Sequence, residues 1–307
     1  MGEILKTHNL CKRYKNHWAL SGVNMTINEG DIYGFVGENG SGKTTVIRLI
    51  AGLISATQGH YELFGADSRT KDVLSARKNI GAIVETPSIY TNMSAKDNLK
   101  MQCGLLGIKK DIDEIVKATL GEVGLADLYD NKKSASNFSL GMRQRLGIAM
   151  ALLGSPRFLM LDEPMNGLDP AGIVEIRELI LKLNKERNIT FLISSHILTE
   201  LALVATTYGI ISKGRIIKEI SAHELKNADY SYVLLEVQDK GLVIEALKDT
   251  VFANRLQIVE GGVKVFTREV TPLLKTVLER GVVLQGVKSH TFDIEEYYMS
   301  LIGGSHD

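Results

Sequence analysis

The sequence predicts an α/β protein built on a mainly parallel sheet, followed by a smaller α+β unit. Apolar strands alternate with helical patterns over 158–220, a glycine-rich loop at 37–45 joins a strand to a helix, and the order after residue 222 changes to βαββαβ. The alternation of strands with helices is typical of a parallel sheet that has helices on both faces. We therefore expect a first domain at 1–222 and a second at 223–307.

The composition indicates a packed globular chain without a nucleic-acid footprint. Of the 307 residues, 44% are hydrophobic and 23% are charged, a balance typical of folded domains. Lys and Arg total 36, and Asp and Glu also total 36, so the formal net charge is zero. Because nucleic-acid binding relies on clustered positive charge, we expect no nucleic-acid partner.

The chain shows no sign of a targeting segment or a membrane span. Its first residues lack the apolar stretch of a signal peptide. The longest apolar run, around 146–153, is shorter than the roughly 18 residues needed to cross a bilayer. Cys11 and Cys103 lie far apart without a CxxC pair, which favours a reducing compartment. We expect no direct membrane spanning.

The first 84 residues are predicted to form short strands around one helix. Apolar patterns and turn residues predict strands at 4–10, 23–27, 32–36, 61–64 and 80–84, and a helix at 45–51. The strand at 32–36 leads directly into the glycine loop and then into the helix. This is the context that a true phosphate-binding loop requires.

A helical subdomain at about 88–154 is expected next. Apolar residues at helical spacing predict helices at 94–106, 111–123 and 140–153, and the first of them begins at a plausible cap, Ser94. The alternating region then predicts strands at 158–161, 190–194, 209–212 and 215–220, with helices at 172–184 and 197–204.

The second domain carries no catalytic motif, so a packing role is its default interpretation. Its pattern predicts, in order, a strand at 231–237, a helix at 242–249, strands at 256–260 and 263–267, a helix at 271–279, a strand at 282–288 and a helix at 294–301.

The loop at 37–45, Gly-Glu-Asn-Gly-Ser-Gly-Lys-Thr-Thr, matches the pattern G-x-x-x-x-G-K-[ST]. Its glycines let backbone N–H groups approach a phosphate, and the following helix start adds a favourable dipole. We expect Lys43 to reach the β- and γ-phosphates of ATP and Thr44 to bind Mg²⁺. The residues expected to contact the nucleotide are Gly37, Asn39, Gly40, Ser41, Gly42, Lys43, Thr44 and Thr45.

Two carboxylates and a histidine follow buried strands. Asp162 and Glu163 end the strand at 158–161, where one carboxylate can hold a metal and its neighbour can polarise a water molecule. We therefore expect Asp162 to be a metal ligand and Glu163 the catalytic base. His196 follows the strand at 190–194, and we expect it to hydrogen-bond the γ-phosphate and sense its loss.

Ser139 and Gly141 stand at the start of the helix at 140–153, in the stretch Ser-Leu-Gly-Met-Arg-Gln. A hydroxyl and N–H groups at a helix start form a second anion site, and an ordinary helix cap is the alternative. Because this stretch lies between a phosphate loop and a strand ending in Asp-Glu, it indicates that two copies of the fold close around ATP.

Together these motifs resemble the nucleotide-binding subunit of an ABC transporter over residues 3–220 or so. The resemblance implies a head-to-tail dimer that holds ATP between the Lys43 loop of one copy and Ser139 of the other. It places Asp169 at the dimer seam and Tyr14 against the adenine, with Trp18 as the rival. The signature departs from the usual Leu-Ser-Gly-Gly-Gln, since it reads Phe-Ser-Leu-Gly-Met, but the Ser and the second Gly are retained.

Glu85 stands where this family usually has glutamine. A carboxylate binds Mg²⁺ more strongly than an amide but adds negative charge near the γ-phosphate. We expect Glu85 to act as a metal ligand and in catalysis; a side chain that points to solvent is the alternative. Together with Pro-Ser-Ile-Tyr at 87–90 and the second domain, Glu85 resembles the bacitracin-export and lantibiotic self-protection branch.

The resemblance implies an ATPase at the cytoplasmic face of a bacterial membrane, working with a separate multi-helix permease that exports or detaches a membrane-active peptide antibiotic. One alternative is the ATPase of an antibiotic-sensing complex that signals to a kinase. Another is a soluble ABC ATPase in translation or DNA repair, which the single cassette and the absence of a basic face disfavour.

Overall fold

The computed structural model describes residues 2–227, 231–290, 297–299 and 301. The chain divides into two compact units, Met1–Ala222 and His223–Asp307, and each is described by itself. Among the described residues, no helix combines the length and apolar character that crossing a membrane would require.

A six-stranded sheet with the order β11-β10-β4-β9-β8-β7 forms the centre of the first unit, which confirms the predicted α/β class. Four of its pairings are parallel, and the pairing of β10 with β11 is antiparallel. Every residue of β4, β8 and β9 is buried, as their apolar sequences require. The strands are β4 (Ile32–Val36), β7 (Ile80–Ile83), β8 (Phe158–Asp162), β9 (Thr190–Ser195), β10 (Thr207–Ser212) and β11 (Arg215–Ser221).

A second, antiparallel sheet has the order β2-β1-β5-β6, with β3 paired to β1. One apolar core joins this sheet to the central sheet and to the first helix, through Leu5, Leu63, Ile47, Phe35 and Leu192. Its strands are β1 (Glu3–Tyr14), β2 (His17–Val23), β3 (Thr26–Asn28), β5 (Gln58–Leu63) and β6 (Ala66–Asp67).

The strand predicted at 23–27 is interrupted: Val23 ends β2, Thr26 begins β3, and Asn24 and Met25 lie between the two strands. The amide side chain of Asn24 holds this break: its Oδ1 accepts a hydrogen bond from the N–H of Asn9 at 2.8 Å, and its Nδ2 donates to the carbonyl of Gly22 at 3.2 Å. Asparagine competes with strand hydrogen bonding through such local contacts.

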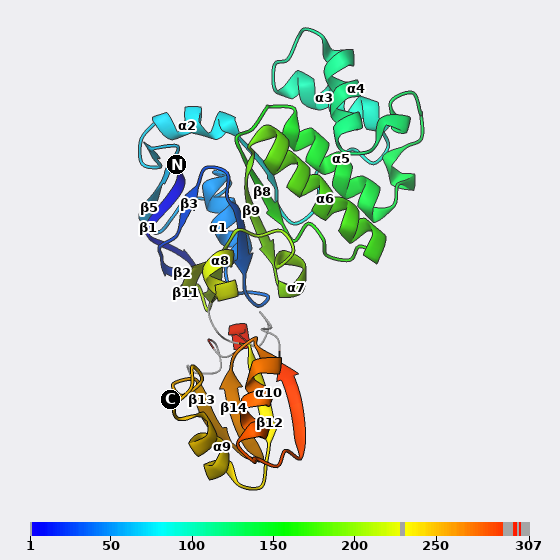
Figure 1. Cartoon of the computed structure of the whole chain (residues 1–307). Helices are drawn as coiled ribbons and strands as arrows, with labels where there is room; N and C mark the ends of the chain where they lie inside the picture. The colour runs from blue at the N-terminus through cyan, green and yellow to red at the C-terminus, as the bar shows by residue number, and fades with distance from the viewer. Residues whose placement is uncertain (1, 228–230, 291–296, 300, 302–307) are drawn as a thin grey trace. The chain divides into compact units, whose positions relative to one another are not determined.

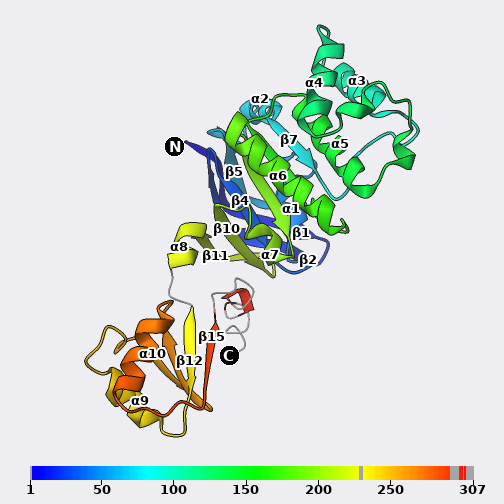
Figure 2. The same ribbon diagram turned by 45° about the vertical axis from the view of Figure 1, so that its right-hand side comes forward.

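The helices of the first unit confirm the predicted helical insert. Figures 1 and 2 both show α3, α4 and α5 gathered at one end of the unit, with α6 beside α5. Ser94 caps α3 as predicted, since its Oγ accepts a hydrogen bond from the N–H of Asp97 at 3.1 Å. The helices of this unit are α1 (Lys43–Ile50), α2 (Asp72–Ala76), α3 (Ala95–Leu105), α4 (Ile112–Glu122), α5 (Leu140–Leu152), α6 (Pro170–Arg187) and α7 (Leu198–Leu201). Helix α8 (Ala222–Asn227) begins at the last residue of this unit and continues in the second.

The second unit has the predicted βαββαβ order around a core of its own, which includes Val233, Leu247 and Leu273. Its four strands form an antiparallel sheet in the order β13-β14-β12-β15. The elements are β12 (Tyr232–Glu236), α9 (Lys240–Leu247), β13 (Leu256–Val259), β14 (Gly262–Phe266), α10 (Val270–Glu279) and β15 (Gly286–His290).

Two predicted elements lie near the C-terminus, a strand at 282–288 and a helix at 294–301. The strand predicted at 282–288 begins later, at Gly286, because the preceding residues end α10. Gly281 has a φ of 78°, and the N–H of Val282 reaches back to the carbonyl of Val277 at 3.2 Å, an arrangement that caps a helix C-terminus. Of the helix predicted at 294–301, residues 297–299 and 301 are helical, and the rest lies outside the described residues.

Candidate functional site

The predicted catalytic and metal-binding residues come from neighbouring strand ends at one edge of the central sheet. β4, β9, β8 and β7 are parallel neighbours, so their carboxyl ends lie side by side. These ends lead into the glycine loop, His196, the Asp162–Glu163 pair and Glu85, respectively. Ligands of open parallel sheets bind at this edge. Chain segments far apart in sequence therefore deliver their polar groups to one place.

The glycine loop needs glycine at two positions because of close packing. A Cβ atom on Gly37 would lie 2.4 Å from the carbonyl oxygen of Ile211. A Cβ atom on Gly42, which has a φ of 114°, would lie 2.6 Å from Cδ2 of Leu20. Gly40 has a φ of 82° with open space beside it. Any larger residue at position 37 or 42 would clash, so the loop adopts this conformation because both positions are glycine.

The loop is shaped to receive an anion. The ammonium of Lys43 is buried and donates to the carbonyls of Gly37 at 2.6 Å and Glu38 at 3.2 Å. The hydroxyl of Ser41 is buried without a hydrogen-bond partner among the described residues. A buried hydroxyl without a partner costs free energy, and a phosphate oxygen would satisfy it. The residues of this loop therefore fit the phosphates of a nucleotide.

A cavity of about 180 Å³ opens in front of the loop. It brings together six of the predicted contact residues of the glycine loop with Glu163, the predicted base. Its lining is Ala19, Asn39, Gly40, Gly42, Lys43, Thr44, Thr45 and Glu163. A cleft of this kind, lined by N–H groups, an ammonium and hydroxyls, suits a polyphosphate better than an apolar ligand.

Asp162 connects the glycine loop to β9. Its carboxylate is buried, and Oδ2 accepts a hydrogen bond from Thr44 Oγ1 at 2.8 Å while Oδ1 accepts one from Ser194 Oγ at 2.5 Å. A hydroxyl and a carboxylate in direct contact are oxygen ligands of the kind that Mg²⁺ prefers. The donor set at Thr44 and Asp162 therefore fits this metal ion.

Glu163 lies between two nitrogen groups. Its Oε2 is 2.7 Å from Nδ1 of His196, and its Oε1 is 3.4 Å from Nζ of Lys43. The backbone is in the left-handed region, with a φ of 50°, and the N–H of Glu163 is held by Ser194 Oγ at 3.0 Å. A left-handed conformation is uncommon outside glycine, and the hydrogen bond from the N–H of Glu163 to Ser194 helps to hold it here.

The carboxylate of Glu85 does not point at the Thr44–Asp162 pair. It pairs with the guanidinium of Arg48, on α1, at 2.7 Å, and its side chain is 61% exposed. The backbone is nevertheless close to the site, because the N–H of Glu85 is 3.4 Å from Oδ2 of Asp162. The φ of Glu85 is 62°, so this backbone is also left-handed.

Tyr14 and Trp18 belong to the hairpin of β1 and β2. Tyr14 is paired with His17 and Trp18 with Arg13, so the two rings project from opposite faces of the hairpin. The ammonium of Lys12 lies 5.2 Å from the Tyr14 ring. Lys12 is paired with Leu20, the residue that contacts Gly42 of the glycine loop. The pairing register shifts between Lys12 and Arg13, and the hairpin reaches the cavity in front of the glycine loop through Ala19, with both rings exposed.

Ser139, Gly141 and Asp169 are part of a different surface, at the starts of α5 and α6. Ser139 Oγ accepts from the N–H of Met142 at 3.2 Å, and Asp169 Oδ1 accepts from the N–H of Gly172 at 3.1 Å. Both residues are therefore helix caps in this structure. α5 contacts α3, α4, α6 and β7, so the structure does not bring Ser139 and Gly141 to the glycine loop of the same chain.

Sequence reasoning missed two residues of the site. Ser194 binds both the carboxylate of Asp162 and the N–H of Glu163, and Arg48 holds Glu85. Ser194 ends the strand next to β8, so the adjacency of strand ends was the available signal. The pairing of Arg48 with Glu85 depends on side-chain conformation and left no signal in the sequence.

Comparison with known proteins places the chain in a family. The family model described as ABC transporter matches residues 20–166. The chain is 39% identical to the bacitracin transport ATP-binding protein BcrA of Bacillus licheniformis, covering 99% of each chain. It is 42% identical to the lantibiotic transport ATP-binding protein SrtF of Streptococcus pyogenes, covering 70% of this chain and 90% of that one.

Comparison with solved structures agrees with the family that the sequence relatives indicate. The dimeric structure of MJ0796, a bacterial ABC transporter cassette, superimposes with a TM-score of 0.63 at 25% identity, covering 71% of this chain and 98% of that chain. The glycine loop, the Asp162–Glu163 strand end and His196 all belong to the first unit, at the carboxyl edge described above. The chain therefore belongs to the ABC transporter family and is an ATP-hydrolysing subunit related to bacitracin and lantibiotic transport proteins.

Proposed function

We propose that this chain drives a separate membrane permease that exports or detaches a membrane-active peptide antibiotic of the bacitracin or lantibiotic kind. The observation that carries the proposal is the full-length match to BcrA, which includes the second unit and covers 99% of both chains. The chain works at the cytoplasmic face of the membrane, held there by its permease.

The nucleotide is bound by the glycine loop and by a second copy of the chain. Lys43 and Ser41 provide the charge and the free hydroxyl that meet phosphate oxygens, and Tyr14 stacks on the adenine. Ser139 and Gly141 of the other copy complete the site, because their helix start is an anion site that lies away from the loop of their own chain. Asp169 lies at the seam between the copies.

Thr44 and Asp162 would hold Mg²⁺, and the bound ion would supply positive charge to offset the negative charge of the phosphates. Glu163 accepts a proton from the attacking water, and His196 fixes the Glu163 carboxylate and contacts the γ-phosphate. Ser194 holds both acidic residues in place through Asp162 Oδ1 and the N–H of Glu163. Released from Arg48 on closure, the carboxylate of Glu85 would offer the ion a further oxygen ligand.

Closure drives transport because ATP binds the closed dimer more tightly than the open one. The permease contact is a groove of about 300 Å³ beside the Glu85 loop. It lies between Pro87, Gln102 on α3 and Met150 on α5, and a short helix of a permease fits a cleft of this size. Movement of the Glu85 loop during closure therefore reaches the groove directly.

A membrane pulldown tests this proposal. The chain is purified in a gentle detergent from its native membranes, and its partners are identified by mass spectrometry. Recovery of a multi-helix protein that lacks its own phosphate loop is the expected result. The variant Gln102→Arg, which fills the groove, should lose that partner, whereas Gln257→Arg, on exposed strand β13 of the other unit, should retain it.

Two further outcomes separate the alternatives. Recovery with ribosomes or DNA, and without a membrane protein, contradicts the transporter proposal. If a histidine kinase co-purifies and deletion of the chain abolishes antibiotic-induced signalling while antibiotic efflux is unchanged, the chain serves sensing. Loss of bacitracin or lantibiotic tolerance in a Glu163→Gln strain, together with reduced efflux, supports export.

A further inference from the structure

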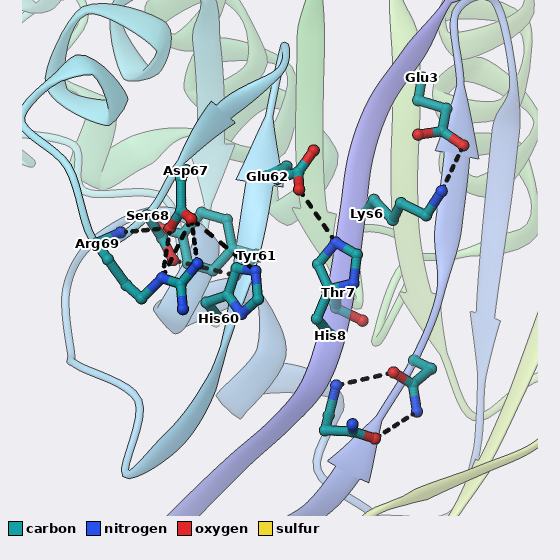
Figure 3. A network of polar contacts seen from close by, with 12 residues as sticks. Glu3, Lys6, Thr7, His8, His60, Tyr61, Glu62, Asp67, Ser68 and Arg69 are labelled. Carbon is teal, nitrogen blue, oxygen red and sulfur yellow. Dashed lines mark hydrogen bonds and ion pairs between the residues drawn. The ribbon is translucent and has the colours of Figure 1, made fainter.

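Two histidines and a glutamate gather on one face of the antiparallel sheet, outside the nucleotide site. His8 on β1 lies directly opposite His60 on β5, and Glu62 follows two residues later on β5. Because side chains alternate along a strand, residues two apart share a face. The strand register therefore places all three side chains together, as Figure 3 shows.

The three side chains are close enough to share one ion. One potential ligand atom from each residue lies within 4.8 Å of the others. Nε2 of His8 is 3.3 Å from Oε1 of Glu62. The rings of His8 and His60 stack with centroids 4.6 Å apart and planes 16° apart. Their in-plane lone pairs therefore run side by side, and both rings have to rotate to direct a nitrogen at one shared ion.

His8 has an unused nitrogen. Its Nε2 is buried, and the approach to Glu62 lacks hydrogen-bond geometry, so the atom has no hydrogen-bond partner among the described residues. Lys6, which lies opposite Glu62 in the sheet, donates instead to Glu3 at 2.9 Å. An imidazole nitrogen and a carboxylate are thus both available for a ligand.

A second carboxylate, that of Asp67, lies next to the cluster of two histidines and a glutamate. Asp67 on β6 lies opposite Glu62, and its Oδ2 is 3.9 Å from Nε2 of His60. The carboxylate of Asp67 also accepts hydrogen bonds from Arg69, among them one from Nε to Oδ2 at 3.1 Å. Metal-bound histidines commonly turn their second ring nitrogen toward such a carboxylate.

We propose that His8, His60 and Glu62 bind a divalent transition-metal ion, with Zn²⁺ as the expected occupant. Two imidazoles and one carboxylate form a recognised zinc ligand set that leaves a fourth position for water. Imidazole nitrogen favours zinc and its neighbours over Mg²⁺ and Ca²⁺, which take oxygen ligands. The ion would join β1 to β5, and β1 ends at Tyr14, the residue proposed to stack on the adenine.

The test is titration of the nucleotide-free full-length chain with Zn²⁺ by calorimetry, and with Co²⁺ by visible absorption, which reports tetrahedral coordination. One ion per chain is expected. His60→Ala and Glu62→Gln should each weaken Zn²⁺ binding at least about tenfold, with folding checked by circular dichroism. Zn²⁺ should also raise the melting temperature of the wild-type chain more than that of either variant.

Two control variants make the outcome decisive. His17→Ala removes a histidine of the neighbouring strand and should leave Zn²⁺ binding unchanged. His196→Ala removes the histidine beside Glu163 and should also leave it unchanged, which separates this site from the nucleotide site. Zn²⁺ binding that is absent, or that is lost in His196→Ala and kept in His60→Ala, overturns the proposal.

Discussion

Nδ1 of His196 lies 2.7 Å from Oε2 of Glu163, and this contact links the end of β9 to the end of β8. An ionised carboxylate has no proton to donate, so the histidine nitrogen is the donor. The other oxygen of Glu163 lies 3.4 Å from the Lys43 ammonium. The carboxylate is therefore held between two nitrogen groups, next to the place where the glycine loop receives phosphate.

Glu163→Gln tests the role of this carboxylate. An amide keeps the shape of the side chain but cannot accept a proton from water. We expect ATP binding to remain and turnover to fall by about a hundredfold or more, the contribution of a positioned base. Phosphate release measures turnover, and size-exclusion chromatography with ATP should show closed dimers accumulating. Near-normal turnover would remove Glu163 from this role.

Ser194→Ala tests the support behind both acidic residues. The substitution leaves Oδ1 of the buried Asp162 carboxylate and the N–H of Glu163 without the serine hydroxyl. Loss of a buried partner should lower the free energy of unfolding by about 1–3 kcal/mol and reduce turnover. The control is Ser195→Ala, whose hydroxyl bonds Ile197 instead. Equal effects of the two substitutions would contradict the positioning role.

Ser139→Ala tests the second anion site. Ser139 caps α5 just as Ser94 caps α3, so each alanine substitution should cost about 1 kcal/mol of stability. Only Ser139→Ala should also prevent ATP-driven dimerisation, measured by sedimentation in the Glu163→Gln background. If Ser94→Ala impaired dimerisation equally, the effect would come from helix stability and not from nucleotide contact.

Arg48→Gln and Glu85→Gln test whether Glu85 works in the metal shell. The Arg48–Glu85 pair is largely exposed, so breaking it should change stability by less than about 1 kcal/mol. Arg48→Gln frees the carboxylate, and we expect it to lower the Mg²⁺ concentration needed for half-maximal ATPase activity. Glu85→Gln should keep nucleotide binding and alter hydrolysis or coupling. Unchanged ATPase activity and unchanged antibiotic tolerance in Glu85→Gln would assign Glu85 to the solvent-exposed alternative.

The lowered pKa of Asp113 predicts that part of the stability of the helical subdomain depends on pH. Hydrogen bonds, first from Lys100 and then from Tyr129, lower the pKa of Asp113 from 3.8 to about 2. A lowered pKa adds stability that is present above pH 3.8 and is lost as the pH falls through 2. The stability difference between wild type and Asp113→Asn should therefore shrink over this interval, measured by urea unfolding. Asp127→Asn, in the same subdomain, is the control.

The sequence alone was sufficient to predict the strands and helices that have a regular apolar pattern or a recognisable capping residue. The strand at Ile32–Val36 and the helix starts at Ser94 and Ser139 follow from apolar runs and caps, which are local signals. The hairpin between Tyr14 and His17 was missed although Asn16 stands in its turn, because Lys15, which has a φ of 50°, gives no turn signal. Asparagine is common in turns, whereas lysine is not among the residues that mark them.

The arrangement of side chains at the site was harder to predict. The sequence indicated that Glu85 stands in a special loop, and the structure adds that its carboxylate pairs with Arg48 on another element. The three-way contact of Thr44, Asp162 and Ser194 depends on the strand order, which joins segments more than a hundred residues apart. Long-range contacts of this kind require the sheet topology.

The central claim is that two copies of this chain hold ATP between the glycine loop of one and the Ser139 helix of the other. The direct test mixes two single-cysteine proteins, Glu38→Cys and Leu140→Cys, each in a Glu163→Gln, Cys11→Ser, Cys103→Ser background, and adds a short bis-maleimide crosslinker. Both engineered positions are exposed. The account predicts a covalent mixed dimer that forms with ATP and not with ADP. A mixture that binds ATP but yields no ATP-dependent crosslink would contradict it.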